Sequence, residues 1–99
     1  MKRNQSEFKL ERECCDIARS AGLASVKIEK NGHTGIPDRL FIADGGNVLF
    51  VEFKRPDGRG NVSDEQSFWL SFLGAGGVLV DSVEGFKSAL FDRFKVKVI

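Results

Sequence analysis

Three charged residues stand in or beside apolar runs of the chain. Asp38 follows Pro37 and precedes "RLFI", while Glu52 and Lys54 lie within "VLFVEFK", the most apolar stretch of the sequence. Side chains alternate across a strand, so a strand over 48–54 would place Glu52 and Lys54 on one face, about 7 Å apart. A carboxylate in such a run is unfavourable unless it has a partner or a task.

A pair of glycines between the two runs predicts a tight hairpin. Asp38 lies seven residues before Gly45, and Glu52 lies six residues after Gly46, so the turn would bring the two acids nearly opposite each other. Carboxylates this close repel unless a cation lies between them. Oxygen ligands suit Mg²⁺ or Mn²⁺. We therefore expect Asp38 and Glu52 to bind one of these metals, with the backbone carbonyl of Phe53 as a further ligand.

This arrangement predicts metal-assisted hydrolysis of phosphodiesters. Lys54 would hold or deprotonate a water, or stabilise the charge that develops on a phosphate. The structural alternative makes Glu52 and Lys54 a salt bridge on a solvated sheet face and Asp38 a turn residue. The chain has one histidine and two adjacent cysteines. Neither a histidine-rich site nor a zinc site is therefore expected, and the cysteines are expected in or near the core of a reduced protein.

The residues around this cluster predict elements in the order α-β-β-β-α-β-α. Apolar residues recur at three- and four-residue spacing over 6–21, which favours a helix that ends at Gly22. Ser63-x-x-Gln66 has the form of a capping box and would begin a second helix. The apolar face of this second helix would comprise Trp69, Leu70, Phe72 and Leu73. The remaining elements would be strands over 24–30, 38–44, 48–54 and 76–81 and a helix over 84–92, with the tail "KVKVI" as an edge strand or a packed terminus. Strand, helix and strand in succession imply a crossover and a parallel pair, so we expect an α/β protein with a mixed sheet.

Length and composition indicate one ordinary globular domain over residues 1–99. The chain is 41% hydrophobic and 29% charged with a net charge of +1, so any basic surface is local. No apolar run approaches the roughly 20 residues that span a membrane. The first residues, "MKRNQSEFKLERE", lack the apolar middle of a signal peptide, which predicts a cytoplasmic location.

The motif also resembles a known nuclease family. Pro37-Asp38 followed by Glu52-Phe53-Lys54 looks like the PD-(D/E)xK signature. With "GIPDRLFI", the glycine turn and "VLFVEFKRPDGRGNVSDEQSFWLSFLGAGGVLV", the chain resembles the VRR-NUC (virus-type replication-repair nuclease) family over most of its length. In size it is similar to stand-alone phage and bacterial members. The resemblance implies a restriction-endonuclease-like mixed sheet flanked by helices, and cleavage of DNA that depends on Mg²⁺ or Mn²⁺.

The resemblance also implies roles for individual residues. Asp38 and Glu52 would be metal ligands, Lys54 the catalytic lysine, and Gln66 a helix glutamine beside the site, unless Gln66 only caps its helix. The family has a glutamate on its first helix, for which Glu11 is our choice, also as a further metal ligand. Glu7 and Glu13 are the alternatives, and so is a plain surface role for Glu11. The candidate DNA contacts, which are equally interpretable as surface residues, are His33, Arg39, Arg55 and Arg59.

Stand-alone members resemble Holliday-junction resolvases, which implies a branched, four-way DNA substrate and a role in DNA repair. Because a resolvase makes two symmetric nicks, we expect a homodimer with two sites. The apolar residues that would form the dimer interface, or alternatively close the core, are Phe86, Leu90, Phe91 and Phe94. The competing functions are a nuclease of the same fold that acts on flaps or ends, a non-catalytic nucleic-acid-binding module, and a small α/β protein without a nucleic-acid role.

Overall fold

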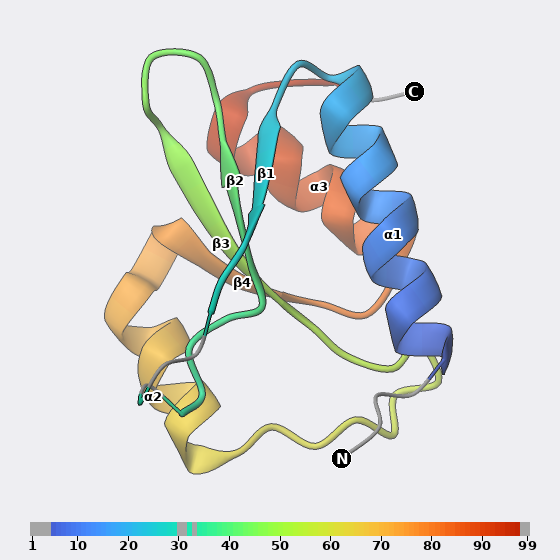
Figure 1. Ribbon diagram of the computed structural model, residues 1–99, viewed down its shortest axis with the longest axis vertical. Helices are drawn as coiled ribbons and strands as arrows, with labels where there is room; N and C mark the ends of the chain where they lie inside the picture. The colour runs from blue at the N-terminus through green and yellow to red at the C-terminus, as the bar shows by residue number, and fades with distance from the viewer. Residues whose placement is uncertain (1–4, 30–31, 33, 98–99) are drawn as a thin grey trace.

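The computed structural model describes residues 5–29, 32 and 34–97 of the chain. Its elements follow the predicted order (Figure 1), with a 3₁₀ turn, η1, between the second helix and the last strand. In chain order they are α1 (Gln5–Ser20), β1 (Ala24–Lys27), β2 (Arg39–Ile42), β3 (Val48–Phe53), α2 (Asp64–Leu73), η1 (Gly74–Gly76), β4 (Gly77–Val80) and α3 (Val83–Phe94).

The four strands form one mixed sheet in the order β1-β2-β3-β4. The first three strands run antiparallel to their neighbours, and β4 pairs in parallel with β3. The α/β class, the mixed sheet and the parallel crossover through α2 are therefore confirmed. Strand boundaries differ: β1 ends at Lys27, although the N–H of Ile28 still donates to the carbonyl of Asp38, and described residues 95–97 form no strand. None of the described helices is long and apolar enough to cross a membrane.

The core lies on one face of the sheet, under α1 and α3. These two helices contact each other as well as the strands. The apolar stripe of α1 buries Leu10, Cys14 and Ala18, and the helix ends where Gly22 takes a φ of 84°, a left-handed conformation that favours glycine. Both cysteines are buried and neither forms a disulfide, as the sequence predicts.

The C-terminal helix closes this core. Phe86 and Leu90 are fully buried, and the Phe86 ring lies 5.1 Å from the ring of Phe41 and 6.4 Å from that of Phe53. Phe94 packs against the same cluster, whereas Phe91 is 51% exposed. Of the two roles considered for these apolar residues, the structure therefore assigns closing the core to all but Phe91, because α3 lies against the sheet along its buried side.

The hairpin between β2 and β3 sets the register that the site needs. Ala43 and Asn47 close a loop of three residues, in which Gly45 and Gly46 have φ values of 95° and 94°, a conformation that favours glycine. The ladder pairs Arg39 with Val51, so one further step along the same register sets Asp38 opposite Glu52. The predicted placement of the two acids across the hairpin is thus confirmed.

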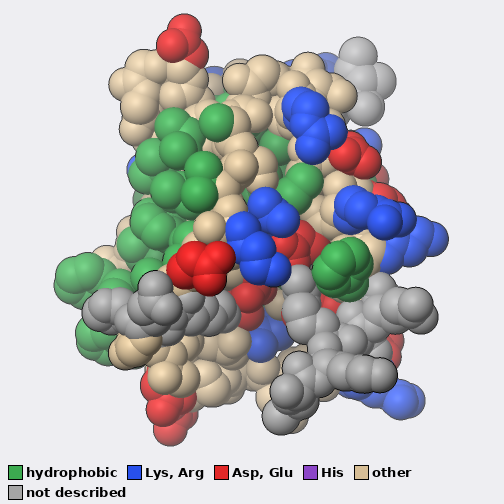
Figure 2. Space-filling view, viewed as in Figure 1, with side chains coloured by type: hydrophobic (Ala, Val, Ile, Leu, Met, Phe, Trp, Pro, Cys, Tyr) green, Lys and Arg blue, Asp and Glu red, His purple; other side chains and the backbone are tan. Residues whose placement is uncertain are grey.

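The second helix begins as expected but lies outside the core. Ser63 caps α2 as predicted, but no residue of α2 is buried, and Phe68 and Phe72 are 60% and 72% exposed. Of the predicted apolar face, Trp69, Leu70 and Leu73 are half-buried and Phe72 is exposed, because α1 and α3 both lie on the other face of the sheet. Figure 2 shows hydrophobic side chains gathered on the left of the view, from the sheet toward α2.

Candidate active site

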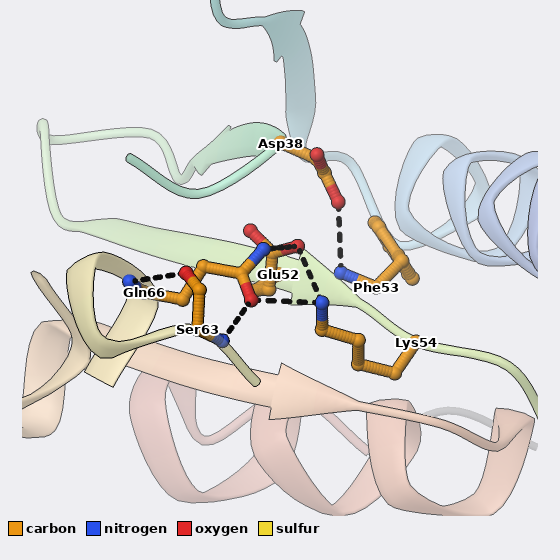
Figure 3. A network of polar contacts seen from close by, with 6 residues as sticks. All are labelled: Asp38, Glu52, Phe53, Lys54, Ser63 and Gln66. Carbon is orange, nitrogen blue, oxygen red and sulfur yellow. Dashed lines mark hydrogen bonds and ion pairs between the residues drawn. The ribbon is translucent and has the colours of Figure 1, made fainter. Parts of the chain in front are cut away.

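The site lies where β2 begins and β3 ends, beside the start of α2 (Figure 3). Asp38 immediately precedes β2, and its Oδ2 accepts a hydrogen bond of 3.0 Å from the backbone N–H of Phe53. The Phe53 side chain is fully buried in the core. This bond therefore attaches the acid at the start of one strand to a rigid position at the end of the next.

Glu52, on β3, and Lys54, which directly follows β3, lie on the sheet face opposite the buried Phe53, as alternation predicts. Glu52 is only 3% exposed, and its Oε2 lies 3.7 Å from Nζ of Lys54. A buried carboxylate needs a compensating charge or hydrogen bonds, and Lys54 supplies the charge. Glu52 and Lys54 do form an ion pair, but the pair is largely buried. A salt bridge on a solvated sheet face, the structural alternative, therefore does not describe it.

Gln66 connects this ion pair to α2. Its Nε2 donates to Oε2 of Glu52 over 3.0 Å, and its Oε1 accepts from Nζ of Lys54 over 2.8 Å. The same Oε1 accepts from the backbone N–H of Ser63, whose Oγ accepts from the N–H of Gln66. Gln66 thus caps its helix and orients both charged residues of β3, so the two roles considered for it coexist.

Gly35 sets the distance between the loop before Asp38 and α2. Its φ is +88°, and a Cβ added there would lie 2.5 Å from Cβ of Glu65 and 2.8 Å from the backbone N of Gln66. Only a glycine permits this approach. Sequence reasoning used this glycine as part of a motif and did not foresee the contact, although a glycine three residues before a site acid is a signal of close backbone approach.

Glu11 lies on α1 and is 4% exposed. It forms an ion pair with Nε of Arg39, whose Nη1 donates to Oγ of Ser25 over 3.2 Å. Arg39, a candidate DNA contact, is therefore held by an acid of α1. Of the alternatives on this helix, Glu7 lines the same cavity as Glu11, whereas Glu13 lines a different groove.

A cavity of about 490 Å³ joins these residues. It is lined by Glu7, Glu11, Lys27, Ile28, Glu29, Asp38, Glu52, Lys54 and Gln66. Five carboxylates face two ammonium groups there, so the cavity carries an excess of negative charge. Such a surplus, made of oxygen donors, suits a hard divalent cation. Within the described part of the chain no three His, Cys, Asp or Glu side chains are grouped as a metal site. Asp38, Glu52 and Glu11, the expected ligands, line one cavity but do not form such a cluster, and Glu11 is paired with Arg39.

Of the remaining candidate DNA contacts, Arg55 and Arg59 bond to Asp57 and not to the residues of the acidic cavity. Arg55 pairs with Asp57 at 2.7 Å, and the backbone N–H of Arg59 donates to the same Asp57. The pKa of the Asp57 carboxyl lies below its ordinary value, first because of the hydrogen bond from Arg59 and then because of the Arg55 charge. His33 lies outside the described residues.

No family model matches the sequence, and no curated protein matches it. A solved structure described as a "VRR_NUC domain" superposes with a TM-score of 0.72 and covers 92% of this chain and 99% of its own, at 20% sequence identity. The chain has the VRR-NUC fold. In this VRR-NUC fold the elements that carry Glu11, Asp38, Glu52 and Gln66 are α1, the start of β2, β3 and α2, and all four residues line one cavity.

Proposed function

We propose that this chain is a metal-dependent nuclease that hydrolyses phosphodiester bonds in DNA. The observation that carries the proposal is the buried Glu52, bonded to Gln66 and 3.7 Å from Lys54, with Asp38 opposite it across the hairpin and in the same acidic cavity. The VRR-NUC fold of the chain supports the same reading. A purely structural role would not require five carboxylates around one cavity.

Mg²⁺ or Mn²⁺ would be held by Asp38 and Glu52, with the backbone carbonyl of Phe53 and, in addition, Glu11 as further ligands. The fit rests on donor chemistry, because these groups offer only oxygen atoms and both carboxylates line the cavity. When bound, the cation would supply a Lewis acid for the phosphate and the attacking water.

The residues of the chain then have separate tasks. The hydrogen bond from Phe53 holds Asp38 in one orientation, and the amide of Gln66 does the same for Glu52. Lys54 is held by Oε1 of Gln66, so its ammonium group is positioned in advance to stabilise negative charge on a phosphate oxygen. Groups that are fixed before the reaction stabilise a transition state without reorganising.

We further propose that the substrate is branched DNA, and specifically a four-way junction, cut by a homodimer. The Asp38, Glu52 and Lys54 cluster of one chain would supply one site, whereas symmetric cleavage of a junction needs two. A flap- or end-acting nuclease and a non-catalytic binding module are the alternatives. The following experiment separates all three.

The test is cleavage of a labelled four-way junction, beside a linear duplex and a flap, with Mg²⁺, Mn²⁺ or EDTA. We expect paired symmetric nicks in the junction that vanish with EDTA and with Glu52→Ala. The matched control is Glu84→Ala, which removes a glutamate that is exposed on α3 and should cut normally. Cutting restricted to flaps or ends would retain the nuclease and reject the junction. If no substrate is cut with either metal while the chain remains folded by circular dichroism, the enzymatic function is wrong.

A further inference from the structure

A second cavity adjoins the acidic one, between α1 and β1. Its volume is about 300 Å³, and its lining residues are Phe8, Glu11, Arg12, Cys15, Asp16, Arg19, Ser25, Lys27 and Arg39. Four cationic side chains face two carboxylates there, so this cavity carries an excess of positive charge. The chain as a whole has a net charge of only +1. The positive charge of this cavity is therefore a local feature, and of its four cationic residues only Arg39 was a candidate site residue from the sequence.

The floor of this basic cavity is built from buried side chains. Glu11 and Cys15 are both buried, and Sγ of Cys15 lies 3.5 Å from Oγ of Ser25. Arg39 is held between Glu11 and Ser25, which fixes one guanidinium group at the bottom. The rim is exposed and carries Arg12, Arg19 and Lys27. Lys and Arg side chains gather over β1 and α1 in Figure 2.

The two cavities share Glu11 and Lys27 in their linings. One is acidic and suits a cation, while the other is basic and suits an anion. A nucleic-acid strand presents one phosphate after another along its backbone. A strand that has one phosphate at the acidic cavity would therefore present a neighbouring phosphate to the basic one. A guanidinium group recognises a phosphate through paired hydrogen bonds, and three of the four cations here are arginines.

We propose that the basic cavity binds a backbone phosphate of the DNA strand that extends from the acidic cavity. This inference rests on the proposed function, because it takes DNA as the ligand. Its contacts are with phosphate alone, so it would contribute affinity and fix the direction of the strand without reading sequence. Arg12 and Arg19 would make these contacts from the rim, with Arg39 fixed below them.

The variants that test it are Arg12→Gln and Arg19→Gln. Both side chains are exposed, and the ion pair of Arg19 with Asp16 is at the surface, where such pairs contribute little to stability. Neither change should therefore unfold the chain. The matched control is Lys97→Gln, which removes the same charge from an exposed position in a groove lined by α3 residues.

The measurement is binding of a labelled DNA duplex across a series of salt concentrations, in a Glu52→Ala background with Mg²⁺ so that the probe is not cut. Each arginine variant should lower the slope of log K against log salt by about one and weaken binding several-fold, because each removes a phosphate contact. Lys97→Gln should leave both unchanged. An equal effect of all three variants, or no DNA binding by any of them, would overturn the inference.

Inorganic phosphate distinguishes a DNA site from a site for a small anion. We expect millimolar phosphate to displace little of the bound duplex beyond its effect through ionic strength. Full displacement of the duplex by phosphate would reject a DNA strand as the ligand of the basic cavity. Failure of the proposed function is separate, since it would appear as absent cleavage by the wild-type chain whatever the binding slopes are.

Discussion

The backbone N–H of Phe53 donates a hydrogen bond of 3.0 Å to the carboxylate of Asp38. Phe53 lies at the end of β3, with its ring in the core, and Asp38 lies just before β2. The hairpin alone brings the two chain segments together, but this bond fixes the orientation of the carboxylate. The position of Asp38 thus depends on the packing of the core.

Replacing Asp38 separates its structural bond from its chemistry. Asp38→Ala leaves the N–H of Phe53 without its acceptor, which should lower the free energy of unfolding by about 1–3 kcal/mol. Asp38→Asn retains an oxygen acceptor and should cost under about 1 kcal/mol, while losing DNA cleavage as fully as the alanine variant. Urea unfolding and a cleavage assay check both parts. Equal stability of the two variants would show that the bond is unimportant.

Gln66→Ala should affect helix and site together. It removes the side-chain half of the capping box and the bonds to Glu52 and Lys54. We expect cleavage to fall by about 10–100-fold, which is typical when an orienting partner of a site residue is lost. Steady-state cleavage of the preferred DNA substrate measures this.

Ser63→Ala is the control for the helix cap. It removes the hydroxyl that accepts from the N–H of Gln66 and should cost about 1 kcal/mol, yet it leaves the Gln66 side chain in place. Its cleavage rate should stay within a few-fold of the wild type at a temperature where both are folded. A loss as large as that of Gln66→Ala would mean that Gln66 acts only through the helix.

Gly35→Ala should be far more damaging than a substitution at another glycine of similar conformation. Gly35 has a φ of +88°, and a Cβ there would meet α2 at 2.5 Å. Gly45 has a φ of +95° with nothing within 4 Å, so Gly45→Ala should lose only the roughly 1–2 kcal/mol of left-handed strain. Thermal unfolding compares the two variants. If their melting temperatures fall equally, the contact of Gly35 with α2 is not constraining.

The buried thiol of Cys14 predicts a loss of stability at alkaline pH. Burial, followed by the charges of Cys15, Glu13 and Glu11, raises its pKa from 9.0 to about 12. Because the folded-state value is the higher one, the contribution to stability is intact below pH 9 and declines as the pH rises from 9 to 12. The slope is at most about 1.4 kcal/mol per pH unit.

Cys14→Ala tests this titration. The variant should be less stable than the wild type at neutral pH, because it leaves a small cavity in the core. Urea unfolding at several pH values should then show the difference between the two proteins narrowing above pH 9. If the difference in unfolding free energy between the two proteins stays constant up to pH 11, the loss of stability at alkaline pH comes from groups other than Cys14.

The sequence was most informative where a period or a turn leaves little freedom. Alternation along 48–54 predicted the shared face of Glu52 and Lys54, and the paired glycines predicted a hairpin that brings Asp38 nearly opposite Glu52, although the exact register comes from a three-residue loop. Strand alternation and the glycine turn depend on residues close together in the sequence, and the packing of the whole chain did not change their outcome. The capping box at Ser63 is a third local pattern of this kind.

Features that depend on which layer covers which face could not be predicted in this way. The apolar residues of α2 fit a buried helix equally well, and only the position of α1 and α3 on the far side of the sheet leaves Phe72 exposed. Likewise the ion pair of Glu11 with Arg39 joins residues 28 positions apart, and no spacing rule connects them. The basic cavity depends on that same packing of α1 against β1.

The second helix is attached to the molecule in an unusual way. It has no buried residue, and it is held partly by the approach of Gly35 and by the bonds of Gln66 to Glu52 and Lys54. Local folding of α2 and occupancy of the cavity are therefore thermodynamically linked. A ligand that binds only when Gln66 is in place protects α2 from local unfolding, and fraying of α2 lowers the affinity for that ligand by the same factor. The solvent-exposed helix thus sets an affinity for a site whose ligand it need not touch.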